Sequence, residues 1–261
     1  MNLIDPFEFR DLFRPARSFA VVGSAPCILE WKNGPSIDAH DVVCRFNRAR
    51  TDGVEESVGR RTDILFVNAS NSLVKGPPPA ETTKPRCLVC FVSPQGAKTL
   101  DIGPFRQWVG DCPVLLTFGP DMIGLPGGRR SRPLTTGTYA LFTLLRLFEV
   151  QKLLVTGFTM MGAVAGGAGH YWEKGKRTDI SFHDLDEEAR LFTALLQQFT
   201  GELTVTDEIQ ALARQTGATL AANGSRAGSY RNPSLGQRLA AGLSWRLLKM
   251  GMYLRRIGET N

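Results

Sequence analysis

Six short, almost uninterrupted apolar stretches limit the folds open to this chain. They are FAVVG (19–23), DVVCRF (41–46), DILFVN (63–68), CLVCFV (87–92), PVLLTF (113–118) and KLLVTGF (152–158). Their lengths and β-branched residues are typical of strands, and the lack of polar alternation indicates burial on both faces. The sequence therefore predicts a mainly parallel sheet with helices on both sides.

Helical patterns lie between and after these strands. We expect helices at 97–109 and 138–148, and a long helix that opens at His183 and Asp184 and runs to Phe199. Strands that alternate with helices predict an α/β fold. We divide the chain into an N-terminal extension (1–18), one α/β domain (19–224) and a basic tail (225–261).

The net positive charge is concentrated in that tail. Lys and Arg number 31 against 25 Asp and Glu, which gives a net charge of +6. The tail holds seven of these cations and one carboxylate, so residues 1–224 are balanced. A neutral body argues against nucleic-acid binding.

Apolar residues of the tail recur at helical spacing. Leu239, Leu243, Leu247, Met250 and Leu254 form one stripe with basic residues beside it. A basic amphipathic helix of this kind is typical of an anionic membrane surface, and also of a terminal helix packed on its own domain. Both interpretations stay open. We expect a cytoplasmic protein. If the tail binds a membrane, the protein is peripheral at the inner membrane face.

The five cysteines do not predict a disulfide framework. Their number is odd, and several lie in the apolar runs. Cys87 and Cys90 have CxxC spacing, but no second pair or histidine lies near them, so we interpret them as part of a buried strand. Acidic residues near the start and the absence of eighteen consecutive apolar residues predict neither a secretory signal nor a spanning helix.

Familiar nucleotide and metal motifs are incomplete. The turn that begins at Gly23 and Ser24 lacks the later glycines of a dinucleotide fingerprint, and no GxxxxGK[ST] sequence occurs. Asp184 and Asp186 have DxD spacing, but they open a helix, where acidic residues are favourable without a metal. We therefore expect no metal and no cofactor.

Three histidines are candidates for proton transfer. His40, His170 and His183 each lie in a polar segment, and histidine titrates near neutral pH. A single histidine more often has a structural role. None of the three is therefore assigned on its own.

Taken together, four segments resemble the motifs of the sialyltransferase family. Residues 20–66 resemble its large sialylmotif, and residues 132–158 resemble its small sialylmotif, with Thr135, Thr136 and Gly137 in the place of S-T-G. His170-Tyr171-Trp172-Glu173 is similar to the third motif. His183 and Glu188 match the HxxxxE of the very small motif. The order of the four motifs is that of the family, over about residues 19–195.

The resemblance implies a single Rossmann-like, GT-A-type catalytic domain that uses a CMP-activated acidic sugar without a metal. It implies that His183 is the base on the acceptor hydroxyl and that His170 steadies the departing phosphate. The implied nucleotide and donor contacts are Gly23, Ser24, Asn47, Thr135, Thr136, Gly137, Gly157 and Tyr171. The implied supporting residues are Asp38, His40, Arg45, Glu173 and Glu188.

Two departures from the family pattern carry predictions. Ser24 stands in the place of the usual Asn, which predicts a shorter or lost side-chain contact to the nucleotide. Phe19 and Phe148 occupy the positions that carry a disulfide in animal members. We predict that the two rings pack together, since buried aromatics offset part of a lost crosslink worth about 2–4 kcal/mol.

The sequence thus predicts an inverting, metal-independent glycosyltransferase that moves sialic acid, or the related acid Kdo, from its CMP derivative. The expected acceptor is a bacterial surface glycan or glycolipid, as in lipopolysaccharide or capsule synthesis. The expected partners are the CMP-sugar, this acceptor and an anionic membrane surface, with no nucleic acid. The alternative is a non-catalytic nucleotide-binding or membrane-adaptor protein of the same fold.

Overall fold

The computed structural model describes residues 1–68, 73–79, 81–92, 101–117, 132–160, 169–172 and 183–220. In this part of the chain, eight strands form one sheet in the order β1-β6-β5-β4-β3-β2-β7-β8. All neighbouring pairs are parallel. The strands are β1 (Asn2–Leu3), β2 (Ser18–Val22), β3 (Val42–Phe46), β4 (Ile64–Asn68), β5 (Cys87–Phe91), β6 (Pro113–Thr117), β7 (Lys152–Thr156) and β8 (Glu202–Val205). Each predicted apolar run contains one of them, and the predicted α/β sheet is confirmed.

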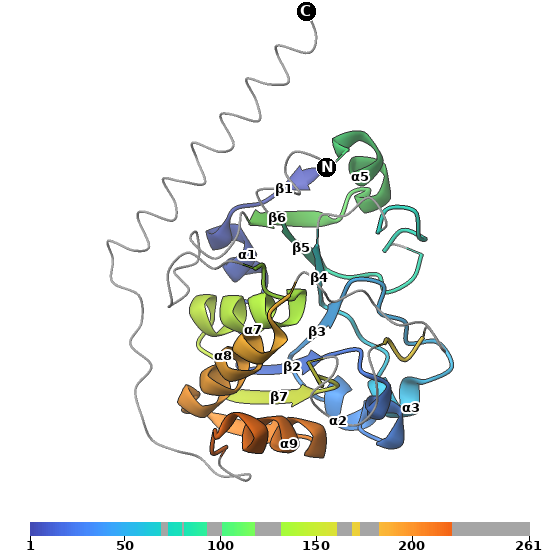
Figure 1. The fold of residues 1–261 in the computed structure, drawn as a ribbon. Helices are drawn as coiled ribbons and strands as arrows, with labels where there is room; N and C mark the ends of the chain where they lie inside the picture. Colours follow the sequence, from blue (N-terminus) through green and yellow to red (C-terminus); the bar gives the residue numbers. More distant parts are fainter. Residues whose placement is uncertain are drawn as a thin grey trace, which may run out of the picture.

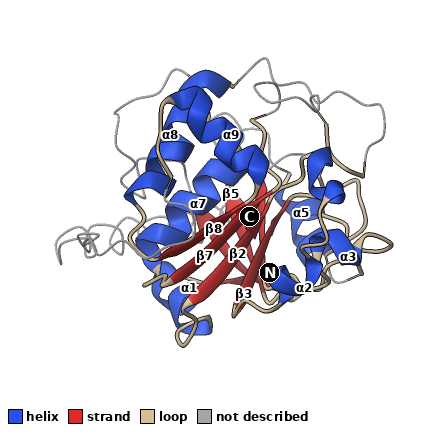
Figure 2. Cartoon of the chain, turned by 90° about the horizontal axis from the view of Figure 1, so that it is seen from below, coloured by secondary structure: helices blue, strands red, loops and turns tan. Residues whose placement is uncertain are grey.

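Helices cover both faces of the sheet. Figures 1 and 2 show α1 (Pro6–Leu12), α7 (Thr136–Leu147), α8 (Leu185–Gln198) and α9 (Asp207–Thr216) on one face. The opposite face carries α2 (Gly34–Asp38), α3 (Glu55–Val58) and α5 (Ile102–Val109), with the short 3-10 helix η1 (Pro26–Glu30) before α2. The expected helices at 138–148 and after His183 are α7 and α8. Of the expected helix at 97–109, the structure describes α5.

Burial on both faces explains why the strands show no polar alternation. Phe19 and Val21 of β2 belong to the core beneath α7 and α8. Ala20 and Val22 of the same strand pack on the other face, with Ile37 of α2. Successive residues of a strand point to opposite faces, so both sets must be apolar.

The segment that we separated as an N-terminal extension contributes to the sheet. β1 is an edge strand of the sheet and pairs with β6, in the register Asn2 to Pro113. Asp5 caps α1 by accepting hydrogen bonds from the N–H groups of Phe7 and Glu8, both at 2.8 Å. This cap starts a helix that carries Phe9 into the core.

The predicted packing of Phe19 on Phe148 is confirmed. The two ring centroids lie 5.1 Å apart. Phe9 and Phe13 join them, with centroids 5.5 and 6.4 Å from that of Phe148. An aromatic cluster thus occupies the position of the crosslink in animal members.

Two further interpretations of the sequence are confirmed. Cys87 and Cys90 are fully buried in β5, and all five cysteines are free thiols. Asp184 caps α8 by accepting a hydrogen bond from the N–H of Glu187, which explains the acidic start of that helix without a metal. The tail at 225–261, with its expected amphipathic helix, lies outside the described residues.

The aromatic cluster gives a test of stability. We expect Phe19→Ala to lower the free energy of unfolding by about 3–5 kcal/mol, because the side chain is fully buried. In a double-mutant cycle with Phe148→Ala, the coupling energy should be about 0.5–1.5 kcal/mol. Denaturant unfolding measures both quantities. The control is Phe7→Ala, whose ring is 43% exposed, and strict additivity of the two core substitutions would contradict the pairing.

Candidate active site

The strand order reverses between β2 and β7. From β2 the sheet continues through β3, β4, β5 and β6 on one side, whereas β7 and β8 lie on the other. In open parallel sheets, ligands bind at the carboxyl ends of the strands beside such a switch point. Gly23, Asn47 and Gly157 directly follow β2, β3 and β7. Three of the predicted donor-binding residues therefore lie along one edge of the sheet.

The backbone segments after β2 and β7 are in direct contact. Gly23 N–H donates to the carbonyl of Thr156 at 2.8 Å, and Ala25 N–H donates to the carbonyl of Gly157 at 2.9 Å. A Cβ on Gly23 would lie 2.1 Å from the oxygen of Gly157. Gly157 itself has a φ of +77°. Both positions therefore require glycine.

His170 is held at this contact by Ser24. Ser24 Oγ and His170 Nδ1 are 2.7 Å apart, and the N–H of Tyr171 donates to the carbonyl of Ser24 at 3.0 Å. The imidazole stacks on Trp172, with centroids 4.7 Å apart and an interplanar angle of 5°. The residue that replaces the family's Asn thus contacts a predicted catalytic histidine.

His183 precedes α8 in the chain and contacts the segment that precedes α7. Its Nδ1 is 2.7 Å from the carbonyl oxygen of Pro133, and Arg132 donates to the carbonyl of His183 at 3.2 Å. A carbonyl accepts hydrogen bonds and cannot donate one, so Nδ1 of His183 carries a proton. In the neutral ring, the lone pair is then on Nε2, which is the arrangement that a general base requires.

Glu188 connects the start of α8 to the start of α7. Its carboxylate is fully buried and accepts hydrogen bonds from the Thr135 N–H, at 2.9 and 3.0 Å, and from the hydroxyls of Thr135 and Thr138. Since His183 lies five residues before Glu188, this anchor fixes the histidine against Pro133. Glu188 thus joins two helix starts, and the supporting role in catalysis that the family motif implies for it stays a prediction.

Phe158 joins the two halves of the site. Its ring packs on those of Phe46 and Phe192, with centroids 5.5 and 5.1 Å apart. A Cβ on Gly137 would lie 2.5 Å from the same ring. The first turn of α7, with Thr136 and Gly137, is therefore held against the carboxyl end of β7. The segments that carry His170 and His183 both meet this end of the sheet.

Asn47 and Tyr171 have structural partners in addition to their predicted contacts with the nucleotide. Asn47 adopts a left-handed conformation, with a φ of +51°, and its Oδ1 accepts a hydrogen bond from the N–H of Asn68 at 3.3 Å. Tyr171 is buried, and its hydroxyl donates to the carbonyl of Arg50. Burial raises the pKa of Tyr171, so the hydroxyl stays a donor.

Two polar residues of the large motif, Asp38 and Arg45, hold the loop before β4, and His40 contacts α2. Arg45 is 1% exposed and donates to the carbonyls of Arg61 and Val58 at 2.8 and 2.6 Å. Asp38 accepts hydrogen bonds from the N–H groups of Arg60 and Arg61. His40 Nδ1 lies 2.9 Å from the carbonyl oxygen of Ser36. In this structure the three supporting residues bind the protein's own backbone.

A second buried carboxylate at the switch point, that of Glu208 in α9, was not predicted from the sequence. Its Oε1 accepts hydrogen bonds from the Gly157 N–H at 2.7 Å and from the hydroxyl of Thr206. Burial and this carboxylate raise the pKa of the Cys27 thiol to about 12, which excludes Cys27 as a thiolate nucleophile at neutral pH. An acidic residue in a first helical turn is common on the surface, so its position in the sequence does not reveal burial.

Two findings apply to the described part of the chain alone. No group of three or more His, Cys, Asp or Glu side chains there is placed to hold a metal ion. None of its helices has the length and the apolar character needed to cross a bilayer. Glu173, predicted as a supporting residue, lies outside the described residues.

Comparison with known proteins connects this geometry to one family. The model described as glycosyltransferase family 29 (sialyltransferase) matches residues 10–93. This stretch includes β2, β3, β4 and β5, and with them the Gly23 turn and Asn47. The resemblance drawn from the motifs is thereby confirmed for this part of the chain.

Individual relatives match over a short segment. A sialyltransferase-like protein 2 of Oryza sativa subsp. indica is 46% identical over 59 residues, which are 23% of this chain and 15% of that protein. The human beta-galactoside alpha-2,6-sialyltransferase 2 is 50% identical over 56 residues, 22% of this chain and 11% of its own length. A beta-1,6-galactosyltransferase of Arabidopsis thaliana is 42% identical over 53 residues, 20% and 13% of the two chains. The matches span less than a sixth of each relative.

Solved sialyltransferases share the fold over most of the chain. A mammalian sialyltransferase superposes with a TM-score of 0.50 and 23% identity, over 73% of this chain and 69% of that one. A variant of the sialyltransferase CST-II in complex with CMP gives a TM-score of 0.51 and 12% identity, over 84% and 92%. The predicted GT-A-type fold of sialyltransferases is confirmed by this likeness.

The anchor at Glu188 gives a second test. We expect Glu188→Gln to lower the free energy of unfolding by about 1.5–3 kcal/mol, because the new amide group would face buried donors. Thermal unfolding followed by circular dichroism measures the loss. Asp186→Asn, on an exposed position of the same helix turn, should change stability by less than about 0.5 kcal/mol. Equal effects of the two substitutions would contradict the anchor.

Proposed function

We propose that this protein is an inverting, metal-independent glycosyltransferase that moves sialic acid, or Kdo, from its CMP derivative to a hydroxyl of a glycan or glycolipid. One observation carries the proposal. His183 donates from Nδ1 to the Pro133 carbonyl, which leaves Nε2 as the basic atom of a histidine at the carboxyl edge of a sialyltransferase-like sheet. The matching family segment at 10–93 supports the choice of reaction class.

The two histidines divide the proton and charge transfers of the proposed reaction. His183 Nε2 takes the proton of the acceptor hydroxyl as its oxygen attacks the anomeric carbon. The bond from this carbon to the CMP phosphate breaks, and the electron pair leaves with the phosphate. When Ser24 donates to His170 Nδ1, the proton of the His170 ring is on Nε2, where it stabilises the departing phosphate. A single displacement of this kind inverts the anomeric centre.

Backbone groups at the switch point suit the nucleotide. The turn at Gly23 and Ser24 would hold the cytidine phosphate, together with Asn47. Thr136 and Gly137 open α7, a helix of 12 residues, and the N–H groups of a first helical turn favour an anion such as the sugar carboxylate. Thr135, whose N–H is bound to Glu188, would border the same anion. Gly157 and Tyr171 would form the wall of the same site.

Replacing the histidines tests the proposal. We expect His183→Ala to lower turnover of CMP-sialic acid by roughly 10²–10⁴-fold while CMP still binds, because the base is lost and the nucleotide contacts stay. CMP release, with CMP-sialic acid and CMP-Kdo assayed separately, measures the rate. His40→Gln is the control, since His40 contacts the Ser36 carbonyl. Full activity of His183→Ala would show that the base is another group.

Two further arms of this assay separate the alternatives. Activity that is lost with EDTA and restored by Mn²⁺ or Mg²⁺ would contradict the metal-independent mechanism. One of the matched relatives is named as a galactosyltransferase, so UDP-galactose is the competing donor. Binding of CMP without turnover of any of the three donors would favour the non-catalytic nucleotide-binding or adaptor alternative.

We also propose that the protein works in the cytoplasm, at the inner face of the membrane. The support is the concentration of the whole net charge of +6 in residues 225–261. We expect the full chain to co-sediment with vesicles that contain anionic lipid. A chain that ends at residue 224 should lose most of this binding, because the basic residues of the tail supply the electrostatic attraction. Neutral vesicles are the control. Equal sedimentation of the two chains would contradict the proposal.

A further inference from the structure

A polar groove has a lining that includes none of the predicted site residues. It has a volume of about 530 Å³ and is lined by three segments, 51–55, 60–63 and 82–86. The second segment leads directly into β4 and the third into β5. The groove therefore opens beside the amino ends of these strands, whereas His170 and His183 belong to the carboxyl edge.

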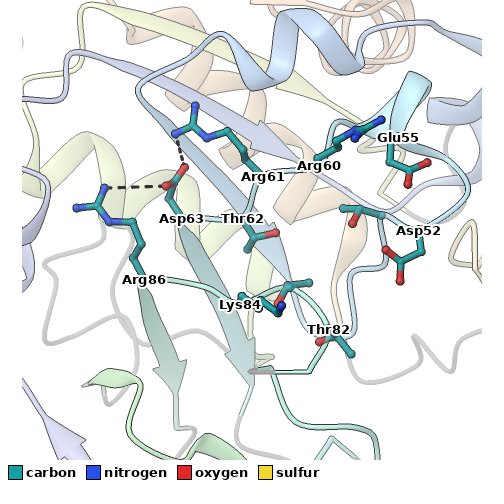
Figure 3. Close-up of a pocket in the computed structure, with 11 residues that line it drawn as sticks. Asp52, Glu55, Arg60, Arg61, Thr62, Asp63, Thr82, Lys84 and Arg86 are labelled. Carbon is teal, nitrogen blue, oxygen red and sulfur yellow. Dashed lines mark hydrogen bonds and ion pairs between the residues drawn. The ribbon is translucent and has the colours of Figure 1, made fainter.

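Every residue that lines the groove is polar or charged. Its residues are Thr51, Asp52, Glu55, Arg60, Arg61, Thr62, Asp63, Thr82, Thr83, Lys84 and Arg86. Figure 3 shows Arg61 and Arg86 turned toward Asp63 at one end, with Glu55 and Asp52 at the other. Arg61 and Arg86 approach Asp63 to 2.9 and 3.9 Å. Three of the seven charges are thus already engaged with one another.

The other four charged residues are two cations, Arg60 and Lys84, and two carboxylates, Asp52 and Glu55. Within the described residues, no ion pair involves Arg60, Lys84, Asp52 or Glu55. Hydrogen bonds from the backbone N–H groups of Glu55 and Gly53 lower the pKa of the Glu55 carboxyl, and Arg60 adds to the effect. Glu55 therefore stays a carboxylate that accepts hydrogen bonds. The groove offers two cationic donors and two anionic acceptors to a ligand.

One detail of the groove wall indicates a binding site. Lys84 has a φ of +45°, a strained conformation for a residue with a side chain, and such strain gathers at ligand sites.

We propose that this groove binds an acidic saccharide, that is, a sugar unit with a carboxylate and several hydroxyls. Arg60 and Lys84 would bind the carboxylate through charge-assisted hydrogen bonds. Asp52 and Glu55 would accept hydrogen bonds from sugar hydroxyls. A phosphate dianion fits less well, because it would add two negative charges beside two carboxylates. The inference rests on the lining of the groove and does not depend on the proposed transfer reaction.

Saturation-transfer NMR with D-glucuronate as the probe tests this site. The full chain is kept saturated with CMP, and D-glucose and inorganic phosphate are run in parallel. We expect binding of glucuronate, much weaker binding of glucose and phosphate, and a loss of glucuronate affinity of at least tenfold in Arg60→Gln/Lys84→Gln. The matched control is Lys152→Gln, an exposed lysine paired with Glu202 at the other side of the sheet.

The outcomes separate this proposal from the proposed function. The inference is overturned if glucuronate does not bind, if CMP displaces it, if glucose or phosphate binds as well, or if the double variant retains full affinity. If the double variant does not fold, Arg60→Gln alone gives the same comparison, because the Arg60 side chain makes no hydrogen bond or ion pair with the described residues. Failure of CMP to bind would count against the transfer reaction and leave the glucuronate measurement valid.

Discussion

The backbone contact between Gly23 and Gly157 determines the geometry of the whole site. The sheet continues through β3 on one side of β2 and through β7 on the other. The carboxyl ends of β2 and β7 approach so closely that a Cβ on Gly23 would lie 2.1 Å from the carbonyl oxygen of Gly157. Ser24 and His170 are placed by the first turn, and Phe158 with the start of α7 by the second. A substitution at either glycine would therefore displace both histidine-bearing segments at once.

Much of the fold could be predicted because burial on two faces leaves an unmistakable apolar pattern. The six internal strands and the long helix after His183 follow from it. β1 and β8 could not be found in this way, since Asn2–Leu3 is two residues long and Glu202–Val205 has exposed positions. Such edge strands are defined by their partners, β6 and β7, and local sequence carries little information about pairing.

The candidate site was predictable where motifs resemble a family, and less so where tertiary contacts decide the role. The motifs identified His170, His183 and Glu188, whereas Glu208 escaped notice because its neighbours in the sequence are those of an ordinary surface helix. Asp38, His40 and Arg45 show the converse. They match a family motif, yet Asp38 and Arg45 bind backbone groups of the loop before β4, and His40 contacts the Ser36 carbonyl in α2. A polar pattern in the sequence does not separate scaffold from ligand contact.

The aromatic cluster around Phe148 has a consequence for the order of events during synthesis. Phe9 and Phe13 dock on a residue more than 130 positions later in the chain, and β1 pairs with β6, which begins at Pro113. At ribosomal speeds, the strand partner emerges roughly 5–20 s after β1. Until then β1 lacks its strand partner, and Phe9 and Phe13 lack Phe148, so this segment exposes apolar surface that chaperones can shield.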